Sequence, residues 1–143
     1  MKNCKVLIIA SGAYISGAEV ITLDVIFGLK RMGFDIHCLV NGWNDGDFIS
    51  KLKSNEVPFT EAKFGWYYLN KPSWTFDSLI NYPKALWQFL KLKKKFHADI
   101  VYTISFRQIA LLYPFLNRNI FYHVHDPNSH SAQSKFFLKL INK

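Results

Sequence analysis

Apolar runs and apolar stripes alternate along the chain. The first run, Cys4 to Ser11 (CKVLIIAS), is almost continuously apolar, as are strands that are buried on both faces of a parallel sheet. A glycine-bearing loop follows, from Gly12 to Gly17. From Ala18 to Met32 the apolar residues recur at helical spacing, and Gly33 provides a stop signal. This part of the pattern predicts a strand, a loop and a helix.

The alternation continues to the last residues. We predict further strands at Phe34 to Val40, Val57 to Phe59, Asp99 to Ile104 and Ile120 to Val124. We predict further helices at Phe48 to Asn55, Pro83 to Phe96, Arg107 to Leu116 and from about Ala132. This order predicts an α/β fold in a single domain: a Rossmann-like, doubly wound parallel sheet. Such folds bind ligands beyond the carboxyl ends of the strands, near the switch in strand order.

One segment interrupts the alternation. Lys63 to Tyr82 is rich in aromatic residues and contains Pro72 as a helix breaker. We interpret it as a long excursion at the carboxyl edge of the sheet, with room for one turn of helix. Long loops inside a compact domain are often functional.

Composition narrows the class of protein. The chain has 143 residues, half of them apolar, which suffices for one hydrophobic core. No apolar stretch approaches the ~18 residues of a membrane span. Cys4 and Cys38 are interpreted as reduced thiols of a cytoplasmic protein. The formal net charge of +8 predicts an anionic partner.

One run of the chain, Leu90 to His97 (LKLKKKFH), is cationic. A helix with lysines there, preceded by Trp87, could lie on anionic lipid headgroups at the inner face of a membrane. We do not expect nucleic acid as a partner, because the chain has neither an RNP-like aromatic motif nor a recognition helix.

The loop S-G-A-Y-I-S-G-A-E (Ser11 to Glu19) has two glycines at the spacing of a P-loop. Ala18 and Glu19 stand where the lysine and the hydroxyl residue would be, so the chain is not expected to be an NTPase. The dinucleotide fingerprint is absent as well. Two interpretations remain: an ordinary turn, or a loop whose amides approach a pyrophosphate or a sugar hydroxyl.

The segment Y-H-V-H-D-P-N (Tyr122 to Asn128) carries two histidines that share one face of a strand. One hypothesis is a zinc-dependent hydrolase that uses His123, His125 and Asp126. The other places His125 alone at the crevice as a hydrogen-bonding residue. We predict that His123 is a core histidine and that His37, inside the second predicted strand, is structural.

The ordered set of motifs resembles the N-terminal domain of family 4 glycosyltransferases of the GT-B class. The motifs are the Ser11–Glu19 loop, the helix end K-R-M-G, the strand F-D-I-H-C-L-V, H-A-D-I-V-Y-T (His97 to Thr103) and I-F-Y-H-V-H-D (Ile120 to Asp126). The resemblance implies a hexosyltransferase of polysaccharide biosynthesis. It would transfer a sugar from a nucleotide-diphosphate sugar to a glycan or lipid-linked acceptor with retained stereochemistry. It would need no obligatory metal and no cofactor.

The resemblance also implies roles for individual residues. Gly12, Gly17 and Glu19 match positions that bind the donor, and His125 matches the catalytic-site histidine that hydrogen-bonds the transferred sugar. The aromatic excursion would bind the acceptor, because sugar C–H faces stack on aromatic rings. We expect Trp66, Tyr67 and Trp74 to do this; an aromatic lid over the sheet edge is the alternative.

The resemblance covers residues 1–143 as one N-terminal domain. Enzymes of this class hold most of the donor in a second Rossmann-like domain with two glutamates seven residues apart, and no such domain is found in this sequence. We therefore expect a fragment, or a natural half that works with a partner chain, and expect it to be inactive alone. A non-catalytic, membrane-docking half of a split transferase is a further alternative.

Overall fold

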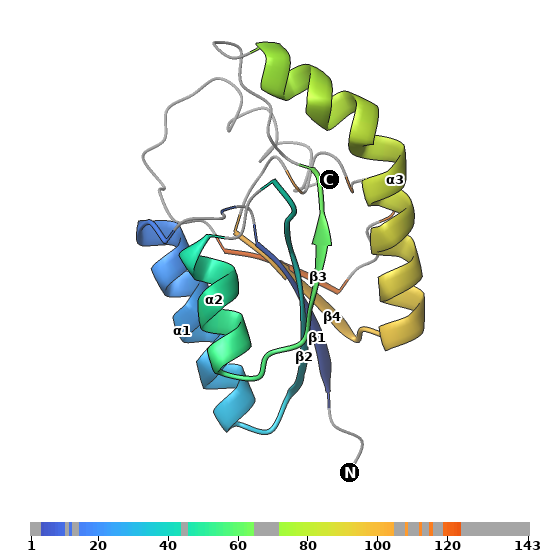
Figure 1. The fold of residues 1–143 in the computed structure, drawn as a ribbon. Helices are drawn as coiled ribbons and strands as arrows, with labels where there is room; N and C mark the ends of the chain where they lie inside the picture. The colour runs from blue at the N-terminus through green and yellow to red at the C-terminus, as the bar shows by residue number, and fades with distance from the viewer. Residues whose placement is uncertain are drawn as a thin grey trace.

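The described residues of the computed structural model, 4–10, 12, 15–43, 46–64, 72–104, 108, 112, 115 and 119–123, form a five-stranded sheet (Figure 1). Its strands are β1 (Lys5–Ile9), β2 (Asp35–Asn41), β3 (Phe59–Ala62), β4 (Ile100–Thr103) and β5 (Ile120–Tyr122). The spatial order is β3-β2-β1-β4-β5, and every neighbouring pair is parallel. This confirms the predicted Rossmann-like α/β fold.

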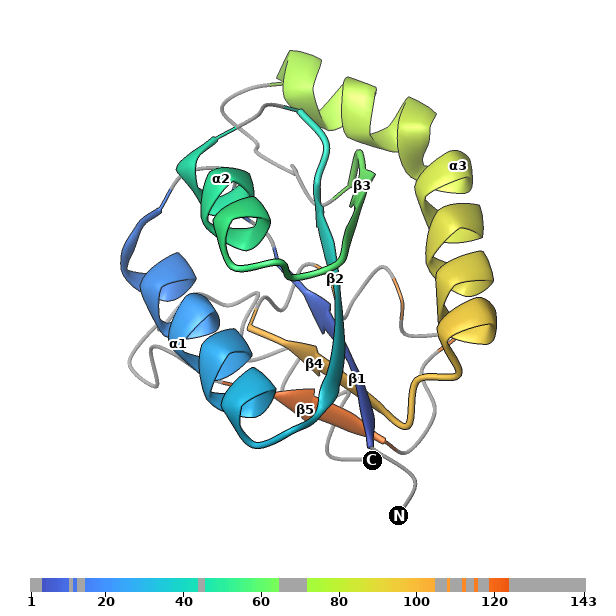
Figure 2. The same ribbon diagram turned by 60° about the horizontal axis from the view of Figure 1, so that its bottom comes forward.

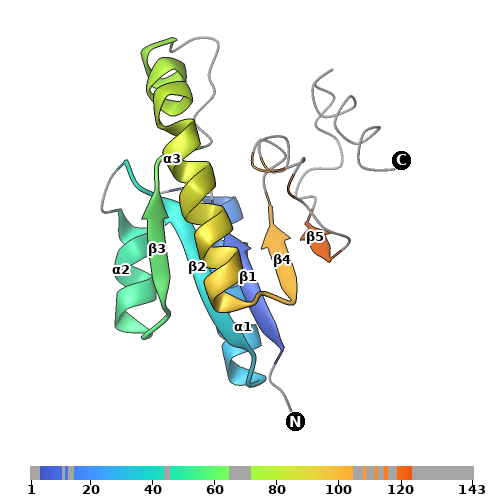
Figure 3. The same ribbon diagram turned by 90° about the vertical axis from the view of Figure 1, so that its right-hand side faces the viewer.

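Helices cover both faces of the sheet. Figure 2 shows α1 (Gly17–Arg31) and α2 (Asp47–Ser54) on one face and α3 (Pro72–Phe96) on the other. Figure 3 looks onto the α3 side, where the strands appear in their spatial order. The connections therefore cross over the sheet as in a doubly wound fold.

Two hydrophobic clusters, one on each face, hold these layers together. On the face of α1 and α2 the buried residues are Val6, Ile8, Ala10, Leu23, Ile26, Ile36, Cys38, Val40, Phe48, Ile49, Leu52 and Val57. On the α3 face they are Leu7, Ile9, Leu39, Ala62, Phe64, Ala85, Phe89, Leu92, Val101 and Leu112. Because β1 contributes to both clusters, its continuous apolar run is explained by burial on both sides.

Helix α1 follows its sequence signals closely. Ser16 is the N-cap, Glu19 lies in the first turn, and Lys30 lies in the last turn. Gly33 takes a φ of 81°, which side chains other than glycine's rarely adopt. The Lys30 ammonium donates to the carbonyl oxygen of Asn55 at 2.5 Å, which links the end of α1 to the end of α2.

Strand β3 begins later than predicted. We expected it at Val57 to Phe59, whereas it spans Phe59–Ala62. Pro58 explains the shift: it has no N–H to donate, although its carbonyl accepts from the amide of Cys38 at 2.9 Å. Val57 is buried ahead of the strand instead of within it.

Helix α3 is longer than predicted, so the prediction that Lys63 to Tyr82 is a loop excursion is wrong for its second part. The helix begins at Pro72 and contains Pro83, which we had placed at its start. Ser78, Ala85, Phe89 and Leu92 are buried, and this spacing continues the helical period across the proline. Tertiary packing of this face compensates for the hydrogen bond that Pro83 cannot donate.

The first half of α3 (lime green) and its second half (yellow) run in different directions (Figures 1 and 2). Pro83 lies between them and accounts for the bend. Among the described residues, no helix combines the length and the apolar character that crossing a bilayer requires. The helix predicted from about Ala132 lies outside the described residues, as does most of the one predicted at Arg107 to Leu116.

Candidate functional site

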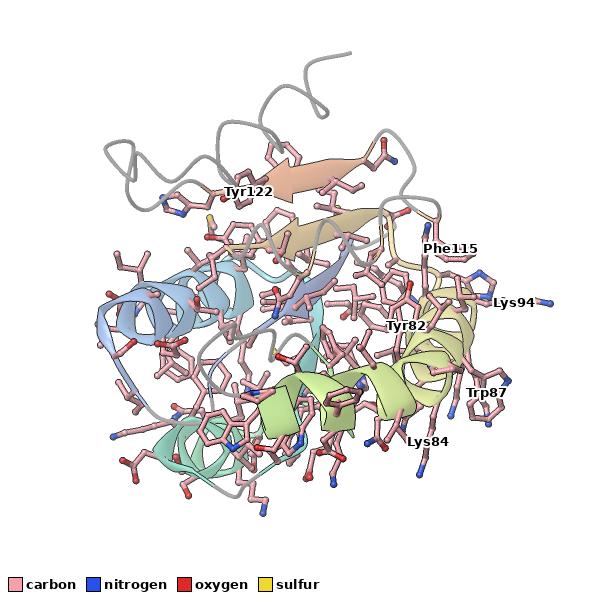
Figure 4. All side chains as sticks on the ribbon, turned by 90° about the horizontal axis from the view of Figure 1, so that it is seen from above. Tyr82, Lys84, Trp87, Lys94, Phe115 and Tyr122 are labelled. Carbon is pink, nitrogen blue, oxygen red and sulfur yellow. The ribbon has the colours of Figure 1, made fainter. Side chains whose placement is uncertain are left out.

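The switch in strand order lies between β1 and β4. From β1 the chain proceeds to β2 and β3 on one side, and afterwards to β4 and β5 on the other. Because the strands are parallel, their carboxyl ends meet at one edge of the sheet. Helix α1, which follows β1, lies on one face, and Leu112, which follows β4, is buried on the other. Doubly wound folds bind ligands at this edge, so the candidate site is built from the residues that lie there. Figure 4 views the molecule from above, the side toward which β3 points in Figure 1.

The loop after β1 is built around Glu19, a buried carboxylate with 6% exposure. The backbone N–H of Ser16 donates to Glu19 Oε2 at 3.3 Å, and the Ser16 hydroxyl donates to the same oxygen. Together with the N-cap position of Ser16, these contacts form a capping box at the start of α1. The structure thus shows Glu19 fixing the entry of the chain into α1.

The two glycines of this loop are in different surroundings. A Cβ on Gly12 would lie 2.2 Å from Glu19 Oε1, so only glycine allows Glu19 to pack against the backbone there. A Cβ on Gly17 would meet nothing within 4 Å. Gly17 is the first residue of α1, where helix amides lack intrahelical acceptors and face outward. Gly12 is thus in close contact with the Glu19 side chain, whereas Gly17 leaves an open helix start.

A residue that the sequence analysis missed lies beyond the end of β4. Gln108 is 1% exposed, and Thr103 Oγ1 donates to its side-chain oxygen at 2.6 Å. The Gln108 side-chain nitrogen is buried without a hydrogen-bond partner. An unpaired buried amide is costly, and this one lies beside Thr103, the last residue of β4. A polar Thr103 at the end of a buried strand was the only sequence signal for it.

At the end of β5, His123 is exposed, which corrects our prediction of a core histidine. The Tyr102 hydroxyl lies 2.8 Å from His123 Nδ1. Burial raises the pKa of Tyr102, so the phenol in this contact keeps its proton. The strand is short and at the sheet edge, which is why His123, the residue after it, reaches solvent.

His125 and Asp126 lie outside the described residues. Within the described ranges, no group of three His, Cys, Asp or Glu side chains could hold a metal ion. The zinc hypothesis depends on both of these residues, together with His123.

Two of the three predicted acceptor residues, Trp66 and Tyr67, also lie outside the described residues. The third, Trp74, lies on the first part of α3 and is 38% exposed. Phe64, another aromatic of the predicted excursion, is buried in the core on the α3 face.

A polar network that the sequence analysis missed joins the end of β2 to α3. The Trp43 indole N–H donates to Asp77 Oδ2, and Asn81 Nδ2 donates to Asp77 Oδ1 at 2.9 Å. The Trp43 amide donates to Asn41 Oδ1 at 3.1 Å. These contacts hold the first half of α3, and Trp74 with it, beside the carboxyl end of β2.

A polar hollow of about 200 Å³ lies nearby, where β3 ends against α3. It is lined by Gly42, Glu61, Lys63, Asn81, Lys84, Ala85 and Gln88. Its lining offers both donors and acceptors, the pairing that sugar hydroxyls require.

His37 is structural, as predicted. Its Nε2 lies 2.9 Å from Thr60 Oγ1, which links β2 to β3, and its ring packs at a tilt against that of Phe96, with centroids 5.6 Å apart. Cys4 and Cys38 are both free. Burial raises the pKa of the Cys38 thiol, which keeps it protonated.

No protein-family model and no curated protein matches the chain. Among solved structures it is similar to Anabaena HepE in complex with UDP and glucose, with a TM-score of 0.64 and 17% identity, over 98% of this chain and 36% of that chain. It is also similar to MurG of Acinetobacter baumannii, with a TM-score of 0.56 and 16% identity, over 78% of this chain and 32% of that chain. The chain therefore spans about a third of the length of either structure. Both are GT-B glycosyltransferases, and the chain has the Rossmann-like fold of their domains.

Proposed function

We propose that this chain is the N-terminal, acceptor-side domain of a retaining glycosyltransferase of family 4. It would move a hexose from a nucleotide-diphosphate sugar to a glycan or lipid-linked acceptor. The rest of the donor pocket is assigned to a second Rossmann-like domain, in the same polypeptide or in a partner chain. The observation that carries the proposal is the fold similarity to HepE, whose structure contains UDP and glucose.

The loop after β1 supports a donor-side role at the crevice. In the proposal, the open start of α1 at Gly17 presents amides to the donor's diphosphate, which a helix N-terminus favours. Gly12 and Glu19 keep that helix start in place through the capping box and the tight backbone contact. Glu19 thus contributes by positioning, because its carboxylate is bonded to Ser16.

His125 is assigned the role of hydrogen-bonding the transferred sugar. Three residues before it, Tyr122 ends β5, the strand next to β4 at the carboxyl edge. A hydrogen bond there orients the sugar toward the acceptor and needs no metal. The leaving diphosphate carries the negative charge, so amides and cations stabilise its departure.

The acceptor is assigned to the side of the crevice formed by β2, β3 and the first half of α3. Trp74, with Trp66 and Tyr67, would stack on sugar rings. The polar hollow beside Asn81, Lys63 and Lys84 supports this assignment, because it offers hydrogen bonds to sugar hydroxyls or to a phosphate. The network of Trp43 and Asp77 fixes this wall.

The test is His125→Ala, made in this chain together with its donor-binding half. UDP-glucose is the first donor probe, and nucleoside diphosphate release is the readout. We expect roughly a 10- to 100-fold lower rate, the value of one hydrogen bond to a charged or reacting group, with unchanged thermal unfolding. His123→Ala is the matched control, because this neighbour is bonded to Tyr102 and should keep its rate.

Normal turnover of His125→Ala would remove His125 from the mechanism. A product of inverted anomeric configuration, measured by NMR, would contradict the retaining mechanism. This chain alone should bind UDP-glucose weakly, because half of the donor pocket belongs to the other domain; tight binding by the chain alone would contradict the division of roles.

A further inference from the structure

Helix α3 is apolar on two opposite sides. Its inner side packs on the sheet through residues such as Phe89, which is 1% exposed. Its other side carries large apolar side chains into solvent: Phe76 is 65% exposed, Ile80 is 76% exposed and Trp87 is 59% exposed. Leu79 and Leu90 are exposed as well. At 100° per residue all five fall within about 60° of one direction, so they form a single stripe.

Lysines accompany this stripe. Lys84, Lys91, Lys94 and Lys95 are exposed on α3, and helical spacing puts them within or beside the stripe. The Lys91 ammonium lies 4.7 Å from the centre of the Trp87 ring. We call these four lysines, with Phe76, Leu79, Ile80, Trp87 and Leu90, the outer face of α3. Figure 4 shows Lys84, Trp87 and Lys94 projecting away from the sheet.

Negative charge is nearly absent from α3. Its single acidic residue, Asp77, accepts hydrogen bonds from Trp43 and Asn81. The outer face therefore presents cations and apolar groups together without an acid between them. No described segment covers the outer face, because its large apolar side chains remain exposed to solvent in the folded chain. Large apolar side chains exposed together on one side of a helix indicate an interaction site.

The positive charge and the apolar stripe together indicate which kind of partner fits the outer face of α3. Nucleic acid would use the lysines but would leave the exposed aliphatic side chains in water. A membrane surface rich in anionic lipids uses both: the lysines meet the headgroup phosphates, and the aromatic and aliphatic side chains enter the interface. Tryptophan beside lysine is typical of this boundary.

A groove beside the outer face adds a place for headgroups. It has a volume of about 460 Å³ and is lined by Trp87, Lys91 and Lys95 of α3, with Thr60 and His37 from the sheet. Two cationic side chains thus converge on one hollow whose wall also includes the apolar Leu92 and Phe96. This is the chemistry that accepts a phosphate attached to an apolar chain.

We propose that the outer face of α3 docks this chain on the surface of membranes that contain anionic lipids. The bend at Pro83 makes α3 convex away from the sheet (Figures 1 and 2), so the middle of the outer face reaches a flat surface first. The proposal does not depend on sugar transfer, because docking is measured without any substrate.

Vesicle sedimentation with the full chain tests the proposal. Vesicles of phosphatidylcholine alone are compared with vesicles that also contain phosphatidylglycerol. We expect binding to the anionic vesicles only, weakening as added salt shortens the Debye length below ~10 Å. Soluble glycerol phosphate is included to separate a free headgroup from a bilayer, and it should displace little of the bound protein.

Two variants divide the outer face into its parts. Replacing Lys84, Lys91, Lys94 and Lys95 by Gln should weaken binding by several hundredfold, at about fivefold per lysine. The triple variant Phe76→Ser, Ile80→Ser, Leu90→Ser should reduce binding by at least tenfold at unchanged net charge. The matched controls are Lys51→Gln with Lys53→Gln on α2, and Met32→Ser after α1, which lie on the other side of the molecule and should bind normally.

Fluorescence gives a second readout that locates the contact. Emission should shift to the blue on anionic vesicles, and Trp87→Phe should keep binding while losing most of that shift. Equal binding to neutral and anionic vesicles, or no binding to either, would overturn the proposal. So would a solution dimer that the triple variant dissociates, because the outer face would then be covered by a second copy of the chain.

Discussion

Helices α1 and α3 flank the same sheet on opposite faces, yet they expose different kinds of side chain to solvent. On α1 the exposed side carries Val20 and Ile21 near its start and changes to Asp24, Lys30 and Arg31 further along. On α3 large apolar side chains remain exposed from Phe76 to Leu90, with Lys84 between them. The inner sides of both helices are equally well buried.

The contrast separates side chains whose burial stabilises the fold from side chains that contribute little to its stability. Burial against the sheet explains the inner side of each helix, and a polar outer side is the usual complement. The outer side of α3 gains nothing from the fold described here, since its large side chains remain in solvent. Its composition therefore points to a contact outside this domain, whereas polar side chains at both ends of α1 bond within the domain, Glu19 to Ser16 and Lys30 to Asn55.

The largest expected effect comes from comparing two phenylalanines on α3. Phe89→Ala should lower the free energy of unfolding by about 3–5 kcal/mol, because it leaves a cavity in the core. Phe76→Ala should change it by less than about 0.5 kcal/mol, because that side chain is exposed. Urea unfolding followed by circular dichroism measures both. Similar losses for the two variants would mean that the outer side of α3 is part of the core.

A smaller effect distinguishes the two glycines at the start of α1. Gly12→Ala should cost about 1 kcal/mol or somewhat more, because its methyl group displaces Glu19 from the capping box. Gly17→Ala meets no neighbour and should be neutral or stabilise the fold by up to about 1 kcal/mol. The same unfolding assay serves for this pair. Equal destabilisation would show that Gly17, and not only Gly12, is restrained in the folded chain.

The smallest effect concerns pH on the α3 face. Burial, and to a lesser degree Lys95, lowers the pKa of His37 from its ordinary value of 6.5. The unfolded chain then binds the proton more readily than the folded chain. The stability that neutral His37 contributes is therefore complete above about pH 6.5, the ordinary pKa of histidine, and is lost as the pH falls from there through the lower pKa of the folded chain. Melting temperatures of the natural protein and of His37→Gln, followed downward from about pH 7.5, should show the natural protein losing more. Parallel curves would contradict this.

The sequence predicted the elements whose signals are local. The run that became β1, the stop of α1 at Gly33 and the strands β2 and β4 each depend on neighbours within a few residues, and their predicted positions agree with the structure to within one or two residues. Proline was the ambiguous signal. Pro72 and Pro83 each fit the first turn of a helix, and only packing of Ser78 against the rest of the molecule shows that the helix includes both.

Contacts between distant segments were the part that sequence could not supply. The bond from Trp43 to Asp77 joins residues 34 positions apart, and nothing in either local pattern indicates it. Gln108 was missed because its burial depends on where its segment meets the end of β4. The burial of His123 was predicted wrongly because β5 lies at the edge of the sheet, and the position of a strand in the sheet depends on tertiary contacts. The roles of His125, Trp66 and Tyr67 remain predictions.

The direction of α3 has a consequence for how an acceptor would arrive. Its second half runs beside the strands, antiparallel to them (Figure 3). With the outer face of this helix resting on a bilayer, the strands lie along the lipid plane and their carboxyl edge opens sideways, parallel to the bilayer surface. An acceptor anchored by a lipid tail would then find the crevice by lateral diffusion in two dimensions, without lifting its tail out of the hydrocarbon.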